Sequence, residues 1–522
     1  MEHFHYGDDF LKSSTALHIA QGKVKGILKE STKEGIRQSA EYVATIVESG
    51  KVVYGINTGF GSLCTTIINP KDTHRLQENI LKSHAVGVGE PIEESLSKLM
   101  LILKVHALSK GFSGVQLSTI ERIIWHIEND VIPVVPKQGS VGASGDLAPL
   151  SHLFLPLIGL GKIFFNGKMQ DTASVLQLFG LEPIALHAKE GLALINGTQF
   201  MAAHGIKAVV EMNRLMDNAD LIATLMVEGL NGSMKPFFQE IHQLRPYKGN
   251  VFVASTIYNL LQGSSIVASH AHCSRVQDPY SLRCIPQIHG ASRNAWLHLK
   301  EVIEIEINSV TDNPIVINDE LTISGGNFHG QPIAMPMDYA TLASSELGNV
   351  SDRRVYLSLE GATNGVPRLL MKDTGLNSGF MILQYTTAAL ASENKSLCFP
   401  ASADSIPTSM GQEDHVSMGS ISGRKLLQVI DNVDKIMSIE LLCAAQAKDF
   451  HTPLTSTPII EAIHAHIRQS IPHIEEDQPM QELLDKALVL IKSGVLVEVA
   501  KQTAQKQQIE FWGTGVEHFE NF

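Results

Sequence analysis

Apolar residues recur every three or four positions along much of the chain, the spacing that places them on one face of an α-helix. Three long stripes of this kind are found at Val209, Met212, Met216, Ala219, Ala223 and Met226, at Ala340, Ala343, Leu347 and Val350, and at Leu426, Val429, Val433, Ile436 and Glu440. Such stripes are typical of helices that pack in a bundle. The pattern therefore predicts a mainly α-helical protein with a core of long helices.

Local signals predict where some shorter elements begin and end. Ser31 and Glu34 have the spacing of a capping box, and Gly50 stands where the same helix would end. The run from Met480 to about Thr503 predicts one further helix. Strand signals are few, and we expect short strands at Lys51–Tyr54 and within Ile315–Ile323.

Glycine clusters divide the chain into two parts. They interrupt the helical pattern at residues 55–61, 87–89 and 139–145, all in the N-terminal part, and again at Gly325 and Gly326. The long stripes begin just after residue 203. We therefore expect a smaller N-terminal domain, 1–203, whose loops carry the active site, and a helical domain, 204–522.

Composition narrows the classes of partner. Hydrophobic residues make up 44% of the 522 residues and charged residues 18%, so we expect subunits to bury surface in an oligomer. The net charge of −13 and the lack of a basic cluster argue against nucleic acid and membranes as partners. Five scattered cysteines without a CxxC pair, and an N-terminus without an apolar secretory core, favour a reduced, cytoplasmic protein.

The segment GSVGASGDLAPL, residues 139–150, carries the candidate chemistry. A nucleophile elbow needs glycine two positions after its serine, where this chain has Asp146, and a phosphate loop needs a lysine that is absent here. The structural alternative is that Gly145 turns the chain and Asp146 caps a helix that begins at Leu147.

The backbone of Ala143-Ser144-Gly145 offers a chemical alternative. In a compressed loop of small residues, the amide nitrogen of Gly145 can attack the carbonyl carbon of Ala143. Loss of two water molecules then turns Ser144 into the exocyclic methylene of a 4-methylideneimidazol-5-one (MIO) ring. This reaction would give the protein a strong electrophile without an external cofactor or a metal.

Further motifs lie in one order along most of the chain: YGINTGFG from Tyr54, LKSHAVGVGEP from Leu81, GSVGASGDLAPLSH from Gly139, GLALINGTQ from Gly191, QDPYSLRC from Gln277, GGNFHG from Gly325 and SIPTSMGQEDHVSMG from Ser405. Together they resemble the aromatic amino acid ammonia-lyases, which are MIO-dependent carbon–nitrogen lyases. The resemblance implies a mainly α-helical homotetramer whose sites are each assembled from more than one subunit. It also implies a small amino acid substrate.

The resemblance implies a role for each matching residue. Tyr54 would be the base for the β-proton, with Tyr280 near the departing amine as a second candidate. Arg283 would hold the substrate carboxylate with its two-pronged guanidinium. Asn196 would donate to that carboxylate or to the prosthetic group, while Gln277 and Phe328 would line the cavity.

Substrate choice is expected to depend on Ser83, His84 and Glu413. His84 can hydrogen-bond an imidazole ring, and Glu413 can accept its N–H. Relatives that act on phenylalanine or tyrosine commonly have Gln at the position of Glu413, whereas this chain resembles the histidine-acting members. The resemblance therefore implies conversion of L-histidine into trans-urocanate and ammonia.

Three other functions compete. A tyrosine or phenylalanine ammonia-lyase, or an aminomutase, would use the same electrophile. A metal-dependent hydrolase would use histidine pairs such as His270/His272 or His464/His466, although residues two apart point to different sides of a helix. A non-catalytic helical interaction protein would keep only the scaffold.

Overall fold

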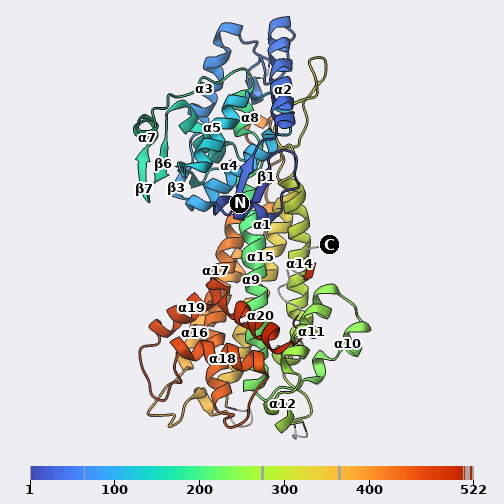
Figure 1. Cartoon of the computed structure of the whole chain (residues 1–522), viewed down its shortest axis with the longest axis vertical. Helices are drawn as coiled ribbons and strands as arrows, with labels where there is room; N and C mark the ends of the chain where they lie inside the picture. Colours follow the sequence, from blue (N-terminus) through green and yellow to red (C-terminus); the bar gives the residue numbers. More distant parts are fainter. Residues whose placement is uncertain are drawn as a thin grey trace. The chain divides into compact units, whose positions relative to one another are not determined.

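The computed structural model describes residues 2–63, 65–271, 275–361, 366–509, 511 and 518–519. As predicted, the fold is mainly α-helical (Figure 1). The chain forms two compact units. The first comprises Met1–Ala208, Leu299–Asp338 and Pro400–Arg424, and the second comprises Val209–His298, Tyr339–Phe399 and Lys425–Phe522. The division expected near residue 203 is close to Ala208, but the chain returns to the first unit twice, because four long helices each have residues in both units.

The first unit consists of helices and small sheets. Its helices are α1 (Ser13–Ala20), α2 (Glu30–Ser49), α3 (Thr73–His84), α4 (Glu94–Leu108), α5 (Leu117–Glu128), α6 (Leu147–Phe154), α7 (Thr172–Leu178) and α8 (Glu190–Ile195). Its strands pair as β1 (Glu2–His5) with β2 (Val24–Ile27), β3 (Val88–Pro91) with β5 (Pro136–Gln138), β4 (Ile132–Pro133) with β6 (Lys162–Phe165) and β7 (Lys168–Asp171), and β8 (Ile315–Val316) with β9 (Thr322–Ile323).

Helix α4 lies in the core of the first unit. The run Leu99–Leu103 is no more than 2% exposed at every position, so this helix is buried on all its sides. Helix α2 ends as predicted, since Gly50 has φ +69° and its N–H bonds to the carbonyl of Val47. The capping box was wrong. The carbonyl of Lys29 already accepts a bond from Lys33 N, so the helix starts before Ser31.

Two strand predictions have different outcomes. The hairpin of β8 and β9 confirms the strands expected within Ile315–Ile323. The strand expected at Lys51–Tyr54 is wrong. The side chain of Asn57 accepts a bond from Val53 N at 2.9 Å and donates one to the carbonyl of Lys51 at 2.8 Å. These local bonds satisfy the backbone in place of a sheet ladder.

The long helices are α9 (Gln199–Gly229), α14 (Ile285–Glu306), α15 (Gln331–Leu359) and α17 (Gly419–Asp449). The second unit adds α10 (Gln239–Gln243), α11 (Lys248–Leu261), α12 (Ser265–Ser269), α13 (Tyr280–Arg283), α16 (Met381–Leu397), α18 (Pro458–Ser470), α19 (Gln481–Ser493) and α20 (Val495–Gln507). The single helix expected from Met480 to Thr503 is wrong, because Gly494, at φ +70°, separates α19 from α20.

All residues of the three predicted stripes are buried, which confirms them as core positions. Small residues bring the helices close together: an added Cβ at Gly229 of α9 would lie 2.8 Å from Cβ of Ala447 of α17. The charged end of the third stripe is also explained, since Glu440 accepts a bond of 3.0 Å from Nη2 of the buried Arg354. A buried carboxylate requires such a partner.

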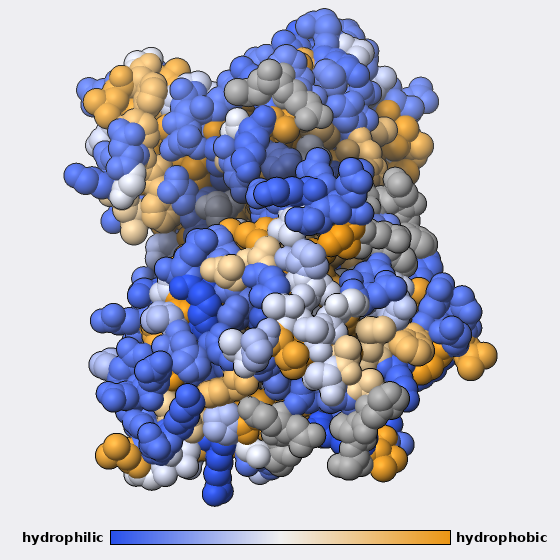
Figure 2. All heavy atoms as spheres, turned by 60° about the horizontal axis from the view of Figure 1, so that its bottom comes forward, coloured by the Kyte–Doolittle hydropathy of each residue, from blue (hydrophilic) through white to orange (hydrophobic). Residues whose placement is uncertain are grey.

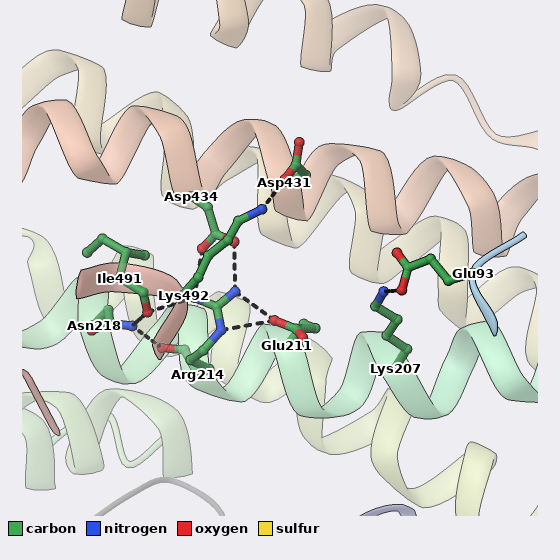
Figure 3. Close-up of polar contacts among 9 residues, drawn as sticks. All are labelled: Glu93, Lys207, Glu211, Arg214, Asn218, Asp431, Asp434, Ile491 and Lys492. Atoms are coloured by element: carbon green, nitrogen blue, oxygen red, sulfur yellow. Dashed lines mark hydrogen bonds and ion pairs between the residues drawn. The ribbon is translucent and has the colours of Figure 1, made fainter. Parts of the chain in front are cut away.

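Polar contacts join α9, α17 and α19 within the second unit (Figure 3). The guanidinium of Arg214 donates bonds of 2.9 and 2.7 Å to the two carboxylate oxygens of Asp434. Nearby, Asn218 bonds to the carbonyl of Ile491 at 3.1 Å. Two parallel donor–acceptor pairs fix a direction as well as a distance, so Arg214 aligns α9 with α17.

The surface drawn in Figure 2 is mainly hydrophilic, with hydrophobic side chains scattered among the polar ones. Several exposed apolar residues of the second unit lie on α15 and α16, namely Tyr339, Leu342, Tyr356, Ile382 and Tyr385. Among the described helices, none has an apolar stretch long enough to span a bilayer.

Candidate active site

The loop that contains Ser144 is held against the segment between α8 and α9. Gly145 has φ +75°, a region in which side chains other than hydrogen are strained. An added Cβ there would lie 2.0 Å from the carbonyl oxygen of Gly197. Gly142 has φ +68°, and its added Cβ would lie 2.1 Å from Oγ of Ser417. Glycine at these two positions therefore lets the loop pack closely against Gly197 and Ser417.

Two N–H groups point at the carbonyl oxygen of Ser144. Nδ2 of Asn196 donates a bond of 3.0 Å, and the backbone nitrogen of Gly197 donates a longer one of 3.4 Å. Asn196 is 3% exposed, and its Oδ1 is buried without a hydrogen-bond partner among the described residues. The pair of donors can stabilise negative charge on the Ser144 oxygen.

The side chain of Asp146 links the loop that contains Ser144 to helix α9. Its carboxylate accepts bonds from Oγ of Ser140 at 2.9 Å and from the backbone nitrogen of Met201 at 3.0 Å. Helix α6 begins at Leu147 as expected, but the predicted side-chain cap is wrong, because the carboxylate is used by these other donors. Complete burial raises the pKa of Asp146 to about 7, against the effect of its hydrogen bonds.

Glu413 reaches Ser144 from a distant part of the chain. The hydroxyl of Ser144 donates a bond of 2.7 Å to Oε1 of Glu413. The other oxygen, Oε2, accepts a bond of 2.7 Å from Oγ1 of Thr408. Backbone bonds between Thr408 and Glu413 close this turn, which fixes the carboxylate over the serine.

A cavity of about 920 Å³ opens beside Ser144. Among the predicted site residues, its lining includes Tyr54, Ser83, His84, Ser144, Asn196 and Glu413. A second cavity of about 520 Å³ shares Tyr54, Ser144, Asn196 and Glu413 and adds Ala143 and Phe328. The structure therefore brings together most of the predicted site residues around Ser144.

His84 is the last residue of α3. Its Nδ1 lies 2.9 Å from Oγ of Ser83. Partial burial lowers the pKa of His84, while the neighbouring Ile80 carbonyl and the charge of Glu413 act in the opposite direction. The neutral ring is therefore favoured, and a neutral ring can both donate and accept a hydrogen bond.

Tyr54 lies in a turn directly before the glycine-rich segment 55–61. Its phenolic oxygen accepts a bond of 3.3 Å from the backbone nitrogen of Gly61. Because the ring is half-buried and lines both cavities, its oxygen is placed where a bound ligand can be reached.

Gln277, Tyr280 and Arg283 belong to the second unit, whereas the residues around Ser144 belong to the first. They lie close to one another: Nη2 of Arg283 donates a bond of 3.0 Å to Oε1 of Gln277, and the guanidinium carbon lies 4.6 Å from the centroid of the Tyr280 ring. Tyr280 is 70% exposed. These three residues form a cluster within the second unit.

The histidine pairs proposed as metal ligands were His270/His272 and His464/His466, and the structure shows what His464 contacts. Nε2 of His464 lies 2.9 Å from Oδ1 of Asp449, which also accepts from Arg468 and His473 through its other oxygen. His272 falls outside the described residues, as do Cys64 and Cys273. Within the described ranges, no three side chains of His, Cys, Asp or Glu are grouped as metal ligands.

The sequence model of the aromatic amino acid lyase family matches residues 11–469. The chain belongs to this family. Among curated aromatic amino acid lyases, the histidine ammonia-lyase of Natranaerobius thermophilus is 44% identical over 478 residues, 91% of this chain and 94% of that protein. That of Sorangium cellulosum is 47% identical over 474 residues, 89% and 92% of the two chains.

Two solved structures share the fold over nearly the whole chain. The crystal structure of histidine ammonia-lyase from Trypanosoma cruzi superposes with a TM-score of 0.88 at 39% identity and covers 96% of each chain. Tyrosine aminomutase from Streptomyces globisporus has a TM-score of 0.91 at 31% identity, covering 96% of this chain and 98% of that one.

Sequence reasoning missed two residues at the site of this aromatic amino acid lyase. Thr408 orients Glu413, and Lys104 donates a bond of 2.6 Å to the carbonyl of Asn196. Lys104 had a visible signal, because it is a lysine within the apolar run 99–108. A lysine buried in such a run needs polar partners from elsewhere in the fold. Thr408 lies within the motif SIPTSMGQEDHVSMG, but its contact with Glu413 appears only in the structure.

Proposed function

We propose that this protein eliminates ammonia from L-histidine to give trans-urocanate, with an MIO group formed from Ala143, Ser144 and Gly145. The observation that carries the proposal is the hydrogen bond between Ser144 and Glu413, which places the electrophile precursor beside the carboxylate expected to select histidine. The curated relatives named histidine ammonia-lyase, at 44% and 47% identity, support the same substrate.

The residues present fit such a prosthetic group. The loop has glycine on both sides of Ala143 and Ser144, and at Gly142 and Gly145 a side chain would collide with its neighbours. Asn196 and Gly197 supply donors to the oxygen that would become the ring carbonyl. The unpartnered Oδ1 of Asn196 leaves an acceptor at the site. When formed, the group supplies an electron-deficient carbon that makes ammonia a better leaving group.

The chain's own groups perform the proton transfer and recognition. Oη of Tyr54 takes the β-proton of the substrate, a role supported by its place in both cavities beside Ser144. Nearby, the amide of Asn196 and the N–H of Gly197 hold negative charge on the Ser144 oxygen during the reaction.

Glu413 and His84 select the side chain of the substrate. An imidazole N–H can donate to Glu413, and the ring of His84 can bond to the other imidazole nitrogen. A phenyl ring offers no such donor and would leave the carboxylate poorly compensated. Ser83 orients His84 through Nδ1. Phe328 contributes an apolar wall.

Arg283, Gln277 and Tyr280 act in the site of another subunit of a homotetramer. Arg283 binds the substrate carboxylate, Gln277 lines the site, and Tyr280 stands near the departing amine. This arrangement is supported by α15 and α16, which expose several large apolar side chains that another subunit could cover. The tetramer works in the cytoplasm, and its one small-molecule partner is the amino acid.

A tyrosine-acting enzyme is the second candidate, because a tyrosine aminomutase structure superposes with a TM-score of 0.91. Incubating the purified protein with L-histidine, L-tyrosine and L-phenylalanine in parallel separates the candidates. Urocanate from histidine is expected. Coumarate, cinnamate or a β-amino acid without urocanate would favour the second candidate. The absence of any product would favour the non-catalytic scaffold.

A further inference from the structure

We propose that Lys104 is a positioning residue that strengthens the hydrogen-bond donors facing the Ser144 carbonyl oxygen, acting through the peptide group between Asn196 and Gly197. This inference rests on the proposed function, because that oxygen gathers charge only if Ser144 becomes part of the electrophile.

Lys104 touches one end of the peptide group whose other end faces Ser144. Its Nζ donates a bond of 2.6 Å to the carbonyl oxygen of Asn196. The N–H of the same peptide group, from Gly197, points at the Ser144 oxygen at 3.4 Å. The C=O and N–H of a trans peptide point in opposite directions. A cation at the carbonyl therefore polarises the group and makes its N–H a stronger donor.

The surroundings of Lys104 keep its ammonium directed at this peptide. Lys104 is 1% exposed, and its second bond, of 3.3 Å, goes to the neutral side chain of Gln199. The charged groups that act on it are Asp312, Lys189 and Asp146. Asp312 already pairs with Lys189 at 2.8 Å. No carboxylate in the described parts of the chain forms an ion pair with Lys104, and its shorter hydrogen bond is the one to the carbonyl of Asn196.

The side chain of Lys104 also changes its charge as the pH passes through neutrality, because its pKa is low for a lysine. Burial lowers its pKa to about 7, although the carboxylates of Asp312 and Asp146 act in the opposite direction. The ammonium form is present below this pKa and is lost as the pH rises through it. A lysine that only fills space would give the site no such dependence.

The test compares the wild type, Lys104→Met and the control Lys98→Met. Lys98 lies on the same helix but pairs with Asp130 at 2.5 Å and has no contact with the site. The mass of the peptide containing Ser144 first gives the fraction that has lost two water molecules. 2-Mercaptoethanol is then added, and mass spectrometry follows the bond between its sulfur and the methylene carbon, with the balancing proton taken from water.

We expect the addition rate, per thiolate and per dehydrated chain, to fall about tenfold in Lys104→Met and to stay unchanged in Lys98→Met. This is less than the roughly hundredfold loss that removal of a direct donor causes. In the wild type the rate should also fall as the pH rises through about 7. This fall should be absent from Lys104→Met, and one that persists there belongs to another group, such as Asp146.

Equal rates in the wild type and Lys104→Met would overturn the inference. A flat wild-type profile between pH 6 and 8.5 would also overturn it, even if Lys104→Met did not fold. A wild-type peptide without the loss of water would instead contradict the proposed function itself. The two failures are therefore distinguishable.

Discussion

Ser144 and Glu413 are 269 positions apart in the sequence, yet the serine hydroxyl donates a hydrogen bond of 2.7 Å to the glutamate. The other carboxylate oxygen of Glu413 accepts a hydrogen bond from Thr408, which fixes the orientation of the carboxylate toward Ser144. The contact joins the two parts of the proposed mechanism, namely the origin of the electrophile and the selection of the substrate.

Replacement of Ser144 by alanine tests the first part. Because the methyl group cannot lose a hydroxyl, Ser144→Ala should keep its fold and assembly but lose turnover by about a thousandfold or more. The measurement is kcat on L-histidine, with Tm and sedimentation as controls for fold and assembly. Turnover close to that of the wild type would exclude Ser144 as the source of the electrophile.

Replacement of Glu413 by glutamine tests the second part. Glutamine keeps the size of the side chain but removes its charge, so Glu413→Gln should lower kcat/KM for L-histidine by roughly a hundredfold. The peptide mass must be measured in the same sample, because Glu413 also contacts Ser144. If the peptide is dehydrated as in the wild type and kcat/KM does not change, the specificity argument fails.

Replacement of Tyr54 by phenylalanine separates proton transfer from electrophile formation. Tyr54→Phe keeps the ring but removes the group that takes the β-proton, so kcat should fall by about 10²–10⁴-fold. Dehydration of the Ser144 peptide should be unaffected. Retention of kcat would direct attention to Tyr280 as the base.

The backbone at Gly145 gives a prediction about the loop itself. Gly145 and Gly167 have φ +75° and +70°, but an added Cβ meets Gly197 at the first position and nothing within 4 Å at the second. Gly167→Ala should therefore cost only the strain of its backbone, about 1 kcal/mol in the free energy of unfolding. Gly145→Ala should cost more and should also block dehydration of Ser144. Equal effects of the two substitutions would contradict a role for the close packing of Gly145 against Gly197.

Mixed tetramers test whether sites are shared between subunits. Ser144→Ala and Arg283→Met chains should each be inactive alone, but co-expression should restore part of the activity if Arg283 serves the Ser144 of another subunit. The control is a tetramer in which every chain carries both substitutions, and it should stay inactive. Absence of restored activity in mixed tetramers would place both residues of each site on one chain.

The sequence predicted most of the scaffold, because periodic burial is a local property that residue spacing reveals. The stripe that ends at Glu440 is buried throughout, and Gly50 ends α2 as expected. The predictions of secondary structure failed where a single residue interrupts the pattern or a side chain bonds to the backbone. Gly494 breaks a helix whose apolar pattern continues across it, and the side chain of Asn57 takes the backbone bonds of the predicted strand Lys51–Tyr54.

The candidate site was partly predictable for a different reason. Tyr54, His84, Asn196 and Glu413 were found through motifs, and the structure gathers them around Ser144. Lys104 lies in no such motif, and its role depends on a contact across 92 positions that residue spacing does not reveal. Long-range contacts of this kind need the folded chain.

The most direct test of the account is the mass of the peptide that contains Ser144, taken from catalytically active protein. Because ring closure and dehydration remove two water molecules from Ala143-Ser144-Gly145, we expect a deficit of that size in the peptide, and in Ser144→Ala no dehydration of residue 144. An unmodified mass in protein that forms urocanate would contradict the central claim.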